Sequence, residues 1–187
     1  MISLSPDEVE HRFSLLGLPN RFTQPEKESL KTIPLVDHKG RIFIFPTPKD
    51  CIGLNVLNLR QILGTDPQKQ PCVFDHPWYL TEEFSLLNSE PGWHGLMMDV
   101  MPDSIAAPLN YVDSRALPAA IEVILMLFLH YVATGEQLLS KKHSWTRDHA
   151  SLGRYVTVGA FGRNGVFISG HPPEYASRGL GTCLKVL

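Results

Sequence analysis

The feature that most constrains the fold is one strongly apolar segment, Pro118–Thr134. Its centre, Val123–Leu129, is hydrophobic on every face of a helix, a pattern typical of a helix that is buried on most sides. The segment contains Glu122 and His130, and it is slightly short for a bilayer span of about 20 residues. The sequence therefore predicts a buried core helix that ends near Gly135, and it predicts no membrane helix.

Short strands are expected around this helix. Residues 155–161 and 166–169 are apolar runs on either side of Gly162-Arg163-Asn164-Gly165, and an Asn-Gly pair between two such runs is the strongest short-range signal for a β-hairpin. The charged residues 141–154, between the long helix and this hairpin, are interpreted as a solvent-exposed loop. The other candidate strands are residues 35–36 paired with 41–45, 71–74, 92–101 and 179–187.

The remaining helices are predicted from capping signals. Ser5-Pro6-Asp7-Glu8 and Thr23-Gln24-Pro25-Glu26 both match a capping box, so a small helical pair is expected within residues 1–33. Residues 55–63 follow a helical period and precede Gly64. These elements predict an α+β fold, in which a mostly antiparallel sheet of short strands and hairpins packs around one buried hydrophobic helix.

Length and composition indicate a single domain over residues 1–187. Hydrophobic residues make up 43% of the chain and charged residues 19%, which excludes a disordered protein. The three cysteines share no Cys-x-x-Cys spacing, so neither a disulfide framework nor a zinc site is expected. Residues 1–8 lack the basic region and apolar core of a signal peptide, and we therefore expect a cytoplasmic protein.

Charge is distributed unevenly along the chain. Residues 61–113 contain eight acids and one base, whereas residues 114–187 contain four acids and eight bases. This asymmetry indicates either a site for a polar ligand or charged partner, or simply two faces of one domain.

Residues 141–154 form the segment that is richest in side chains able to act in catalysis or binding. His143 or His149 is a candidate general base, and Asp148 is a further catalytic candidate. The six-residue separation of the two histidines matches no ligand pair on a helix face, so no metal site is expected. The candidates for binding an anionic group are Lys141, Lys142, Trp145, Arg147 and Arg154.

A second cluster lies within residues 76–99 and combines aromatic rings, imidazoles and acids. Such residues are typical of an apolar pocket with a few polar groups, and Glu83 with Asp99 is a candidate carboxylate pair. The alternative is that the rings fill a gap in the core while the acids face water. The members of this cluster are His76, Trp78, Tyr79, Glu82, Glu83, Trp93, His94 and Asp99.

Three functions are compatible with these residues. The first is a binding module without chemistry of its own, which contacts a protein partner or a small anionic ligand through residues 141–154. The second is a small hydrolase or transferase that uses His143 or His149 with Arg147 and the acids of residues 76–99. The third is nucleic-acid binding, which the net charge of −2 argues against because phosphate neutralisation normally supplies most of the affinity.

The first hypothesis is favoured because the sequence contains no catalytic motif. It has no P-loop, Gly-x-Ser-x-Gly elbow, dinucleotide fingerprint or calcium loop, and we expect no cofactor. The second hypothesis requires a histidine of residues 141–154 within hydrogen-bond reach of an acid in a concave pocket. The third requires the basic side chains of this segment to line one continuous positive groove.

Overall fold

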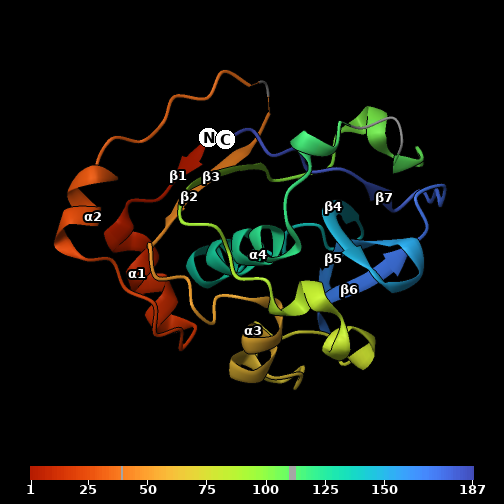
Figure 1. Cartoon of the computed structure of the whole chain (residues 1–187), viewed down its shortest axis with the longest axis horizontal. Helices are drawn as coiled ribbons and strands as arrows, with labels where there is room; N and C mark the ends of the chain where they lie inside the picture. The colour runs from red at the N-terminus through yellow and green to blue at the C-terminus, as the bar shows by residue number, and fades with distance from the viewer. Residues whose placement is uncertain (39, 110–112) are drawn as a thin grey trace.

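The computed structural model describes residues 1–38, 40–109 and 113–187. In this part of the chain the fold is mixed α+β, with two sheets and four α-helices, and the predicted α+β class is confirmed (Figure 1). The helices are α1 (Pro6–Leu15), α2 (Gln24–Ser29), α3 (Val56–Leu63) and α4 (Ala120–Thr134). The strands are β1 (Ile2–Ser3), β2 (Ile42–Thr47), β3 (Gly92–Met97), β4 (His143–Ala150), β5 (Arg154–Gly162), β6 (Gly165–His171) and β7 (Leu180–Gly181).

Helix α4 forms where the apolar segment predicts a helix. Every residue from Ala120 to His130 is buried, and the helix packs against α1, α3, β3, β4 and β5. It ends at Gly135, whose φ of 72° lies in the left-handed region that glycine adopts without strain. Figure 1 shows α4 running across the middle of the molecule, with strands β1–β3 above it and strands β4–β6 beside it.

The N-terminal helices begin at the residues that their capping boxes predict. Ser5 caps α1, because its hydroxyl accepts the N–H of Glu8 while the Glu8 carboxylate accepts the N–H of Ser5 at 2.7 Å. Thr23 and Glu26 form the equivalent box at the start of α2. Lys27 of α2 is bonded to two acids of α1, Asp7 at 2.7 Å and Glu10 at 2.6 Å, which ties the two helices together.

The first sheet has the order β1-β2-β3, and β2 lies in its centre with all six residues buried. The prediction that residues 35–36 pair with 41–45 is wrong. No strand forms at residues 35–36, and Leu35 is 95% exposed. Strand β2 pairs instead with β3, about fifty residues further along the chain, over six residue pairs. This longer ladder pairs every residue of β2, whereas residues 35–36 could have paired only two.

The second sheet has the order β6-β5-β4-β7 and contains the predicted hairpin. Gly162 pairs with Gly165 across a turn made by Arg163 and Asn164, and φ of Gly165 is +94°. The interpretation of residues 141–154 as a loop is wrong, because residues 143–150 form the inner strand β4. Side chains alternate along β4, so that Ser144 and Thr146 face one side of the sheet and His143 and Trp145 the other. The charged residues among them make this strand pattern difficult to recognise in the sequence.

The C-terminal residues join the two sheets. Residues 180–181 pair with β4 as strand β7, and the chain then runs along the free edge of β3. There the Met97 N–H donates to the Leu184 carbonyl at 3.0 Å, and the Val186 N–H donates to the Gly95 carbonyl at 2.8 Å. The predicted strand over residues 179–187 is therefore divided between two partners. None of the helices in the described residues is both long and apolar enough to cross a membrane.

Candidate functional site

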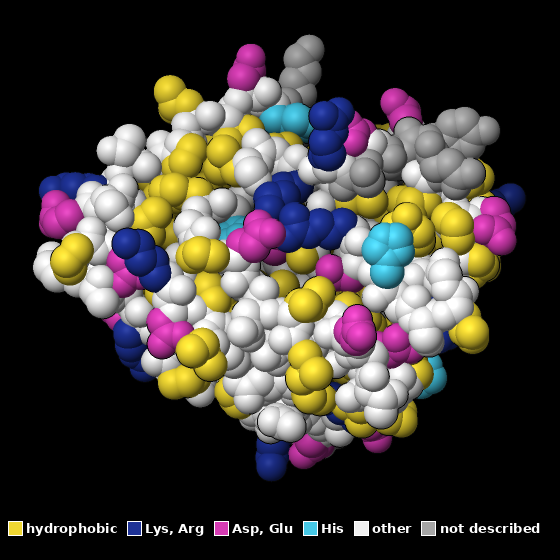
Figure 2. Space-filling model, viewed as in Figure 1, with side chains coloured by type: hydrophobic (Ala, Val, Ile, Leu, Met, Phe, Trp, Pro, Cys, Tyr) yellow, Lys and Arg dark blue, Asp and Glu magenta, His cyan; other side chains and the backbone are white. Residues whose placement is uncertain are grey.

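The acidic and basic segments of the chain meet in space. Three ion pairs connect residues 82–99 with residues 142–154, and they are Lys142 with Asp99 (2.8 Å), Arg147 with Glu90 (2.8 Å) and Arg154 with Glu82 (3.5 Å). The two predicted clusters are thus neighbours, and much of their opposite charge is balanced within the molecule. On the face shown in Figure 2, basic side chains lie directly beside acidic ones rather than along one positive groove. The three ion pairs occupy cations that a positive groove would use, so they do not favour nucleic-acid binding.

Replacing one of these cations should have little effect on stability. We expect Arg147→Ala to change the free energy of unfolding by less than about 1 kcal/mol, because Arg147 and Glu90 are both partly exposed to solvent. Lys185, 3.8 Å from the other carboxylate oxygen of Glu90, remains to balance its charge. Urea denaturation of the two proteins measures the difference. A loss above about 2 kcal/mol would show that the pair behaves as a buried one.

The histidines of β4 do not contact an acid. Burial, followed by the charge of His171, lowers the pKa of His143 to about 4, and the ring packs against Phe167. His149 is exposed and lies against Tyr155, with ring centroids 4.2 Å apart. Within residues 1–38, 40–109 and 113–187, neither histidine is hydrogen-bonded to a carboxylate. The geometry that the hydrolase hypothesis requires is therefore not present at either one.

Two other candidates of β4 are engaged in the fold. Asp148 accepts a hydrogen bond from the N–H of Ala120, at the start of α4, at 2.6 Å. Burial raises the pKa of Asp148, and this effect exceeds the lowering caused by the hydrogen bond. Trp145 is fully buried against Leu180 and its neighbours Leu109 and Leu117. Both side chains thus pack into the protein rather than into a cavity.

The second predicted cluster separates into two parts. Trp78 and Tyr79 pack with Phe84, the Trp78 indole donates to the Ile168 carbonyl at 2.9 Å, and the Arg154 guanidinium lies 5.2 Å from the Trp78 ring centre. Glu83, at the start of a short 3₁₀ helix, is exposed, and Trp93 is half-buried in β3. No hydrogen bond joins Glu83 to Asp99 in the part of the chain that the structure describes. The carboxylate pair of Glu83 and Asp99 therefore stays a prediction.

Two members of this cluster remain. The His76 ring stacks on Phe167, and His94 belongs to a buried ionic network that the sequence analysis missed. Its Nδ1 lies 2.8 Å from a carboxylate oxygen of Glu122, and Lys185 Nζ lies 2.7 Å from the same oxygen. The other oxygen of Glu122 accepts the Ala119 N–H at 2.7 Å. Only 2% of the His94 side chain and 1% of the Glu122 side chain are exposed. The single carboxylate in an otherwise apolar helix is the signal that could have revealed this network.

The second ring nitrogen of His94 also faces acceptors. His94 Nε2 lies 2.9 Å from the carbonyl oxygen of Glu90 and 2.9 Å from the hydroxyl oxygen of Thr47. Thr47 donates its own proton to the same carbonyl at 2.6 Å, so towards the ring it can only accept. Each ring nitrogen of His94 thus lies within hydrogen-bond distance of at least one oxygen atom of the network.

The network keeps Glu122 ionised. Burial acts to raise the pKa of Glu122, but the hydrogen bond and charge of His94, together with the bonds from Lys185 and Ala119, outweigh it and lower the pKa to about 2. All these groups are hydrogen-bonded to one another and none faces a described cavity. The network therefore fastens the C-terminal residues and β3 to the start of α4.

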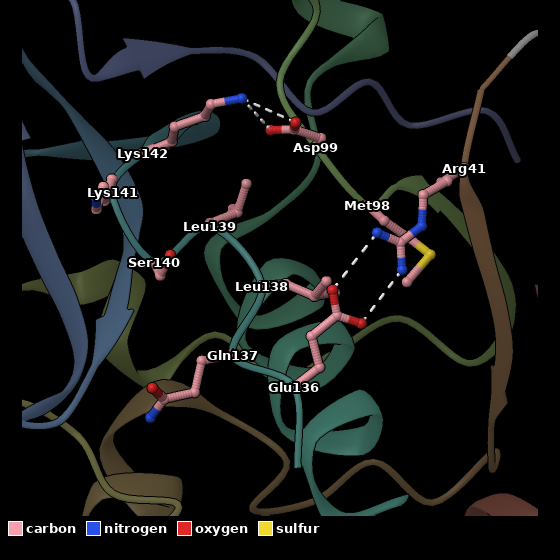
Figure 3. A pocket seen from close by; sticks show the side chains of 10 residues that line it. All are labelled: Arg41, Met98, Asp99, Glu136, Gln137, Leu138, Leu139, Ser140, Lys141 and Lys142. Atoms are coloured by element: carbon pink, nitrogen blue, oxygen red, sulfur yellow. Dashed lines mark hydrogen bonds and ion pairs between the residues drawn. The ribbon is translucent and has the colours of Figure 1, made fainter. Parts of the chain in front are cut away.

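A cavity of about 330 Å³ lies where the α4–β4 connection meets the ends of β2 and β3. Its charged lining residues are Arg41, Lys141 and Lys142 opposed by Asp99 and Glu136, which leaves an excess of one positive charge. Figure 3 shows Lys142 turned toward Asp99 on one side of the cavity and Arg41 turned toward Glu136 on the other, with Leu138 and Leu139 between them. Arg41 was not among the predicted site residues, since nothing local distinguishes it from any other strand residue.

Leu139, in this lining, has an unusual backbone conformation. Its φ of +53° lies in the left-handed region, which is uncommon for a residue with a bulky side chain. Strained backbone of this kind persists where the surroundings impose it, and it clusters at ligand sites. The strain therefore marks this connection as a candidate binding element.

No metal site accompanies these groups. Among residues 1–38, 40–109 and 113–187, no three His, Cys, Asp or Glu side chains are placed to hold a metal ion. Comparison of the chain with models of protein families, with curated proteins and with solved structures finds no match.

Proposed function

We propose that this protein is a binding module without catalytic chemistry of its own, and that it holds a small anionic ligand in the cavity between Arg41 and Lys142. One observation carries the proposal. Two cations of residues 141–154 line one cavity together with Arg41, which directly precedes β2, whereas Arg147 and Arg154 of the same segment line none of the described cavities. A protein partner that presents a carboxylate or phosphate would use the same contacts.

The ion pairs in this cavity can be exchanged for a ligand. Arg41 and Glu136 approach to 3.3 Å and are both about half exposed, and Lys142 and Asp99 are also solvent-accessible. Exposed pairs of this kind contribute only about 0–1 kcal/mol, so an incoming anion can replace the carboxylates at little cost. The ligand anion would then take the place that Asp99 and Glu136 occupy in the unbound protein.

The proposal also covers the domain organisation of the chain and the compartment in which it acts. One apolar core contains residues from Leu4 to Cys183 and most of α4, which supports a single domain over residues 1–187 built around that helix, with α1 and α2 as its N-terminal pair. Cys51, Cys72 and Cys183 are buried free thiols. Unpaired cysteines are usual in a reducing compartment, and this supports the cytoplasm as the site of action.

Calorimetric titration with inorganic phosphate and with succinate at low ionic strength tests the proposed site. We expect saturable binding that weakens with added salt, together with NMR shifts for the amides of residues 136–142. The double variant Lys141→Ala/Lys142→Ala should bind about tenfold more weakly, a loss of about 1.4 kcal/mol. Asp99→Asn should instead tighten binding, because it frees Lys142 without removing a cation.

Lys69→Ala is the matched control for this titration. Lys69 is exposed, lies 3.9 Å from a single acid, Asp66, and lines none of the described cavities. The control should bind both anions as the wild type does. The proposal fails if neither anion binds saturably, or if the control loses as much affinity as the double variant.

A further inference from the structure

A second cavity, of about 550 Å³, lies between residues 19–26 and residues 49–52. It shares no lining residue with the cavity of Arg41 and Lys142. Its walls come from the segment that joins α1 to α2 and from the turn that follows β2. It has three separate features, namely a hydrogen-bond acceptor without a partner, two cations that form no salt bridge within the described residues, and an exposed apolar side chain.

The acceptor is the side-chain carbonyl of Asn20, a lining residue that is only 8% exposed. Asn20 Nδ2 donates to the carbonyl oxygens of Asp50 at 3.0 Å and Ile52 at 3.2 Å. Two carbonyl partners fix the orientation of this amide, because only its NH₂ group can donate to them. Oδ1 is therefore the remaining atom, and it is buried without a hydrogen-bond partner. A buried acceptor of this kind favours a ligand that brings an N–H or O–H group.

The cations are Arg21 and Lys49. Within the described residues neither side chain forms a salt bridge, and Arg21 donates only to the main-chain carbonyls of Leu18 and Asn20. The two lining acids are already engaged by main-chain N–H groups: Glu26 accepts from Thr23 and Lys49, and Asp50 accepts from Ile52 at 3.1 Å. The lining as a whole is neutral, since it has two cations and two acids, but Arg21 and Lys49 are not held in a salt bridge within the described residues and can still bind a carboxylate of the ligand.

The apolar feature is Ile52, which lines the cavity with Pro19 and is 78% exposed. Single exposed apolar residues are common on protein surfaces, so Ile52 alone indicates nothing. Its meaning comes from its position beside a polar cavity. There it offers a hydrophobic contact to a ligand whose polar groups are held by Asn20, Arg21 and Lys49.

We propose that this cavity binds an N-acylated amino acid with a free carboxylate, the chemistry found at the C-terminus of a peptide. A small movement of the cavity wall would uncover the buried Asn20 Oδ1 for the amide N–H of such a ligand, while its carboxylate meets Arg21 and Lys49 and its aliphatic side chain packs on Ile52. Capture of a terminal carboxylate together with a main-chain N–H is a general mode of peptide recognition.

Three small probes separate these contributions. N-acetyl-leucine carries all three groups, N-acetyl-leucinamide lacks the carboxylate, and 4-methylpentanoate lacks the amide. In an NMR titration of the full chain we expect N-acetyl-leucine to bind about tenfold more tightly than either of the others. It should also shift the side-chain NH₂ signals of Asn20. Equal affinity for the three probes, or shifts confined to residues outside this cavity, would overturn the proposal.

Variants supply an independent measurement. Lys49→Ala keeps the main-chain N–H that Glu26 uses, so it should fold normally and weaken binding of N-acetyl-leucine but not of N-acetyl-leucinamide. Ile52→Ser should weaken binding of both, and Leu35→Ser, which removes an even more exposed apolar side chain elsewhere, is its control. If Lys49→Ala leaves the affinity for N-acetyl-leucine unchanged, the assignment of the carboxylate is wrong. The Lys141→Ala/Lys142→Ala variant should bind N-acetyl-leucine normally, because this cavity is independent of the first.

Discussion

Leu127→Asp should abolish folding of the chain. Leu127 is completely buried in the centre of α4 and belongs to the main hydrophobic core. An unpaired buried charge costs several kcal/mol, and the total stability of a domain is only about 5–15 kcal/mol. We therefore expect a variant that is insoluble, or that lacks a cooperative thermal transition and dispersed NMR signals.

Ala133→Asp provides the control on the same helix. Ala133 is exposed near the C-terminal end of α4, where an acid meets only an unfavourable helix dipole worth about 0.3–1 kcal/mol. This variant should fold and unfold cooperatively close to the wild-type temperature. A soluble Leu127→Asp protein with wild-type stability would contradict the buried position of α4, and with it the packing of both sheets on this helix.

Glu122→Gln should be the most destabilising conservative substitution of a charged residue. The change preserves size and hydrogen-bonding shape, but it removes the negative charge that His94 and Lys185 share. Removing one partner of a buried ion pair costs up to about 3–5 kcal/mol, and Lys185 would keep only the partly exposed Glu90, at 3.8 Å, as an acidic partner. Urea denaturation at pH 7 measures this loss as a lower midpoint with an unchanged slope.

The pH dependence distinguishes a lost charge from a simple loss of packing. The folded pKa of Glu122, about 2, lies below its unfolded value of 4.5, so the carboxylate stabilises the fold above pH 4.5. This contribution is lost as the pH falls from 4.5 to about 2. Glu122→Gln lacks the contribution throughout, so the difference in stability between the two proteins should shrink across this window. A constant difference from pH 7 to pH 2 would show that the charge of Glu122 does not matter.

Glu136→Gln is a closely matched control. Glu136 also contacts a histidine and a cation, His130 at 2.8 Å and Arg41 at 3.3 Å, but its side chain is 47% exposed. Water replaces much of the electrostatic interaction that the substitution removes, so we expect the free energy of unfolding to fall by only about 0–1 kcal/mol. The contrast between the two variants isolates burial as the cause, because the chemical partners are nearly the same.

Elements whose signals are local could be predicted from the sequence. The capping boxes at Ser5 and Thr23 begin α1 and α2, the Asn55 side chain caps α3, and the turn at Arg163-Asn164 forms the hairpin. Each depends on groups at most a few residues apart, so the necessary contacts can be inferred from spacing alone. Helix α4 was predictable for a related reason, since a segment that is apolar on all sides must be buried wherever it lies.

Only the tertiary structure decided the contacts between distant segments. His94 and Glu122 are 28 residues apart, Asp99 and Lys142 are 43 apart, and Arg41 and Glu136 are 95 apart, so no spacing rule relates them. The identity of β4 as a strand also depended on its neighbours, because its charges suggested solvent whereas β5 and β7 supply its hydrogen bonds. Local sequence determines which backbone conformation each segment prefers. Which side chains then share a cavity depends on how the two sheets pack around α4, and that packing is a property of the whole chain.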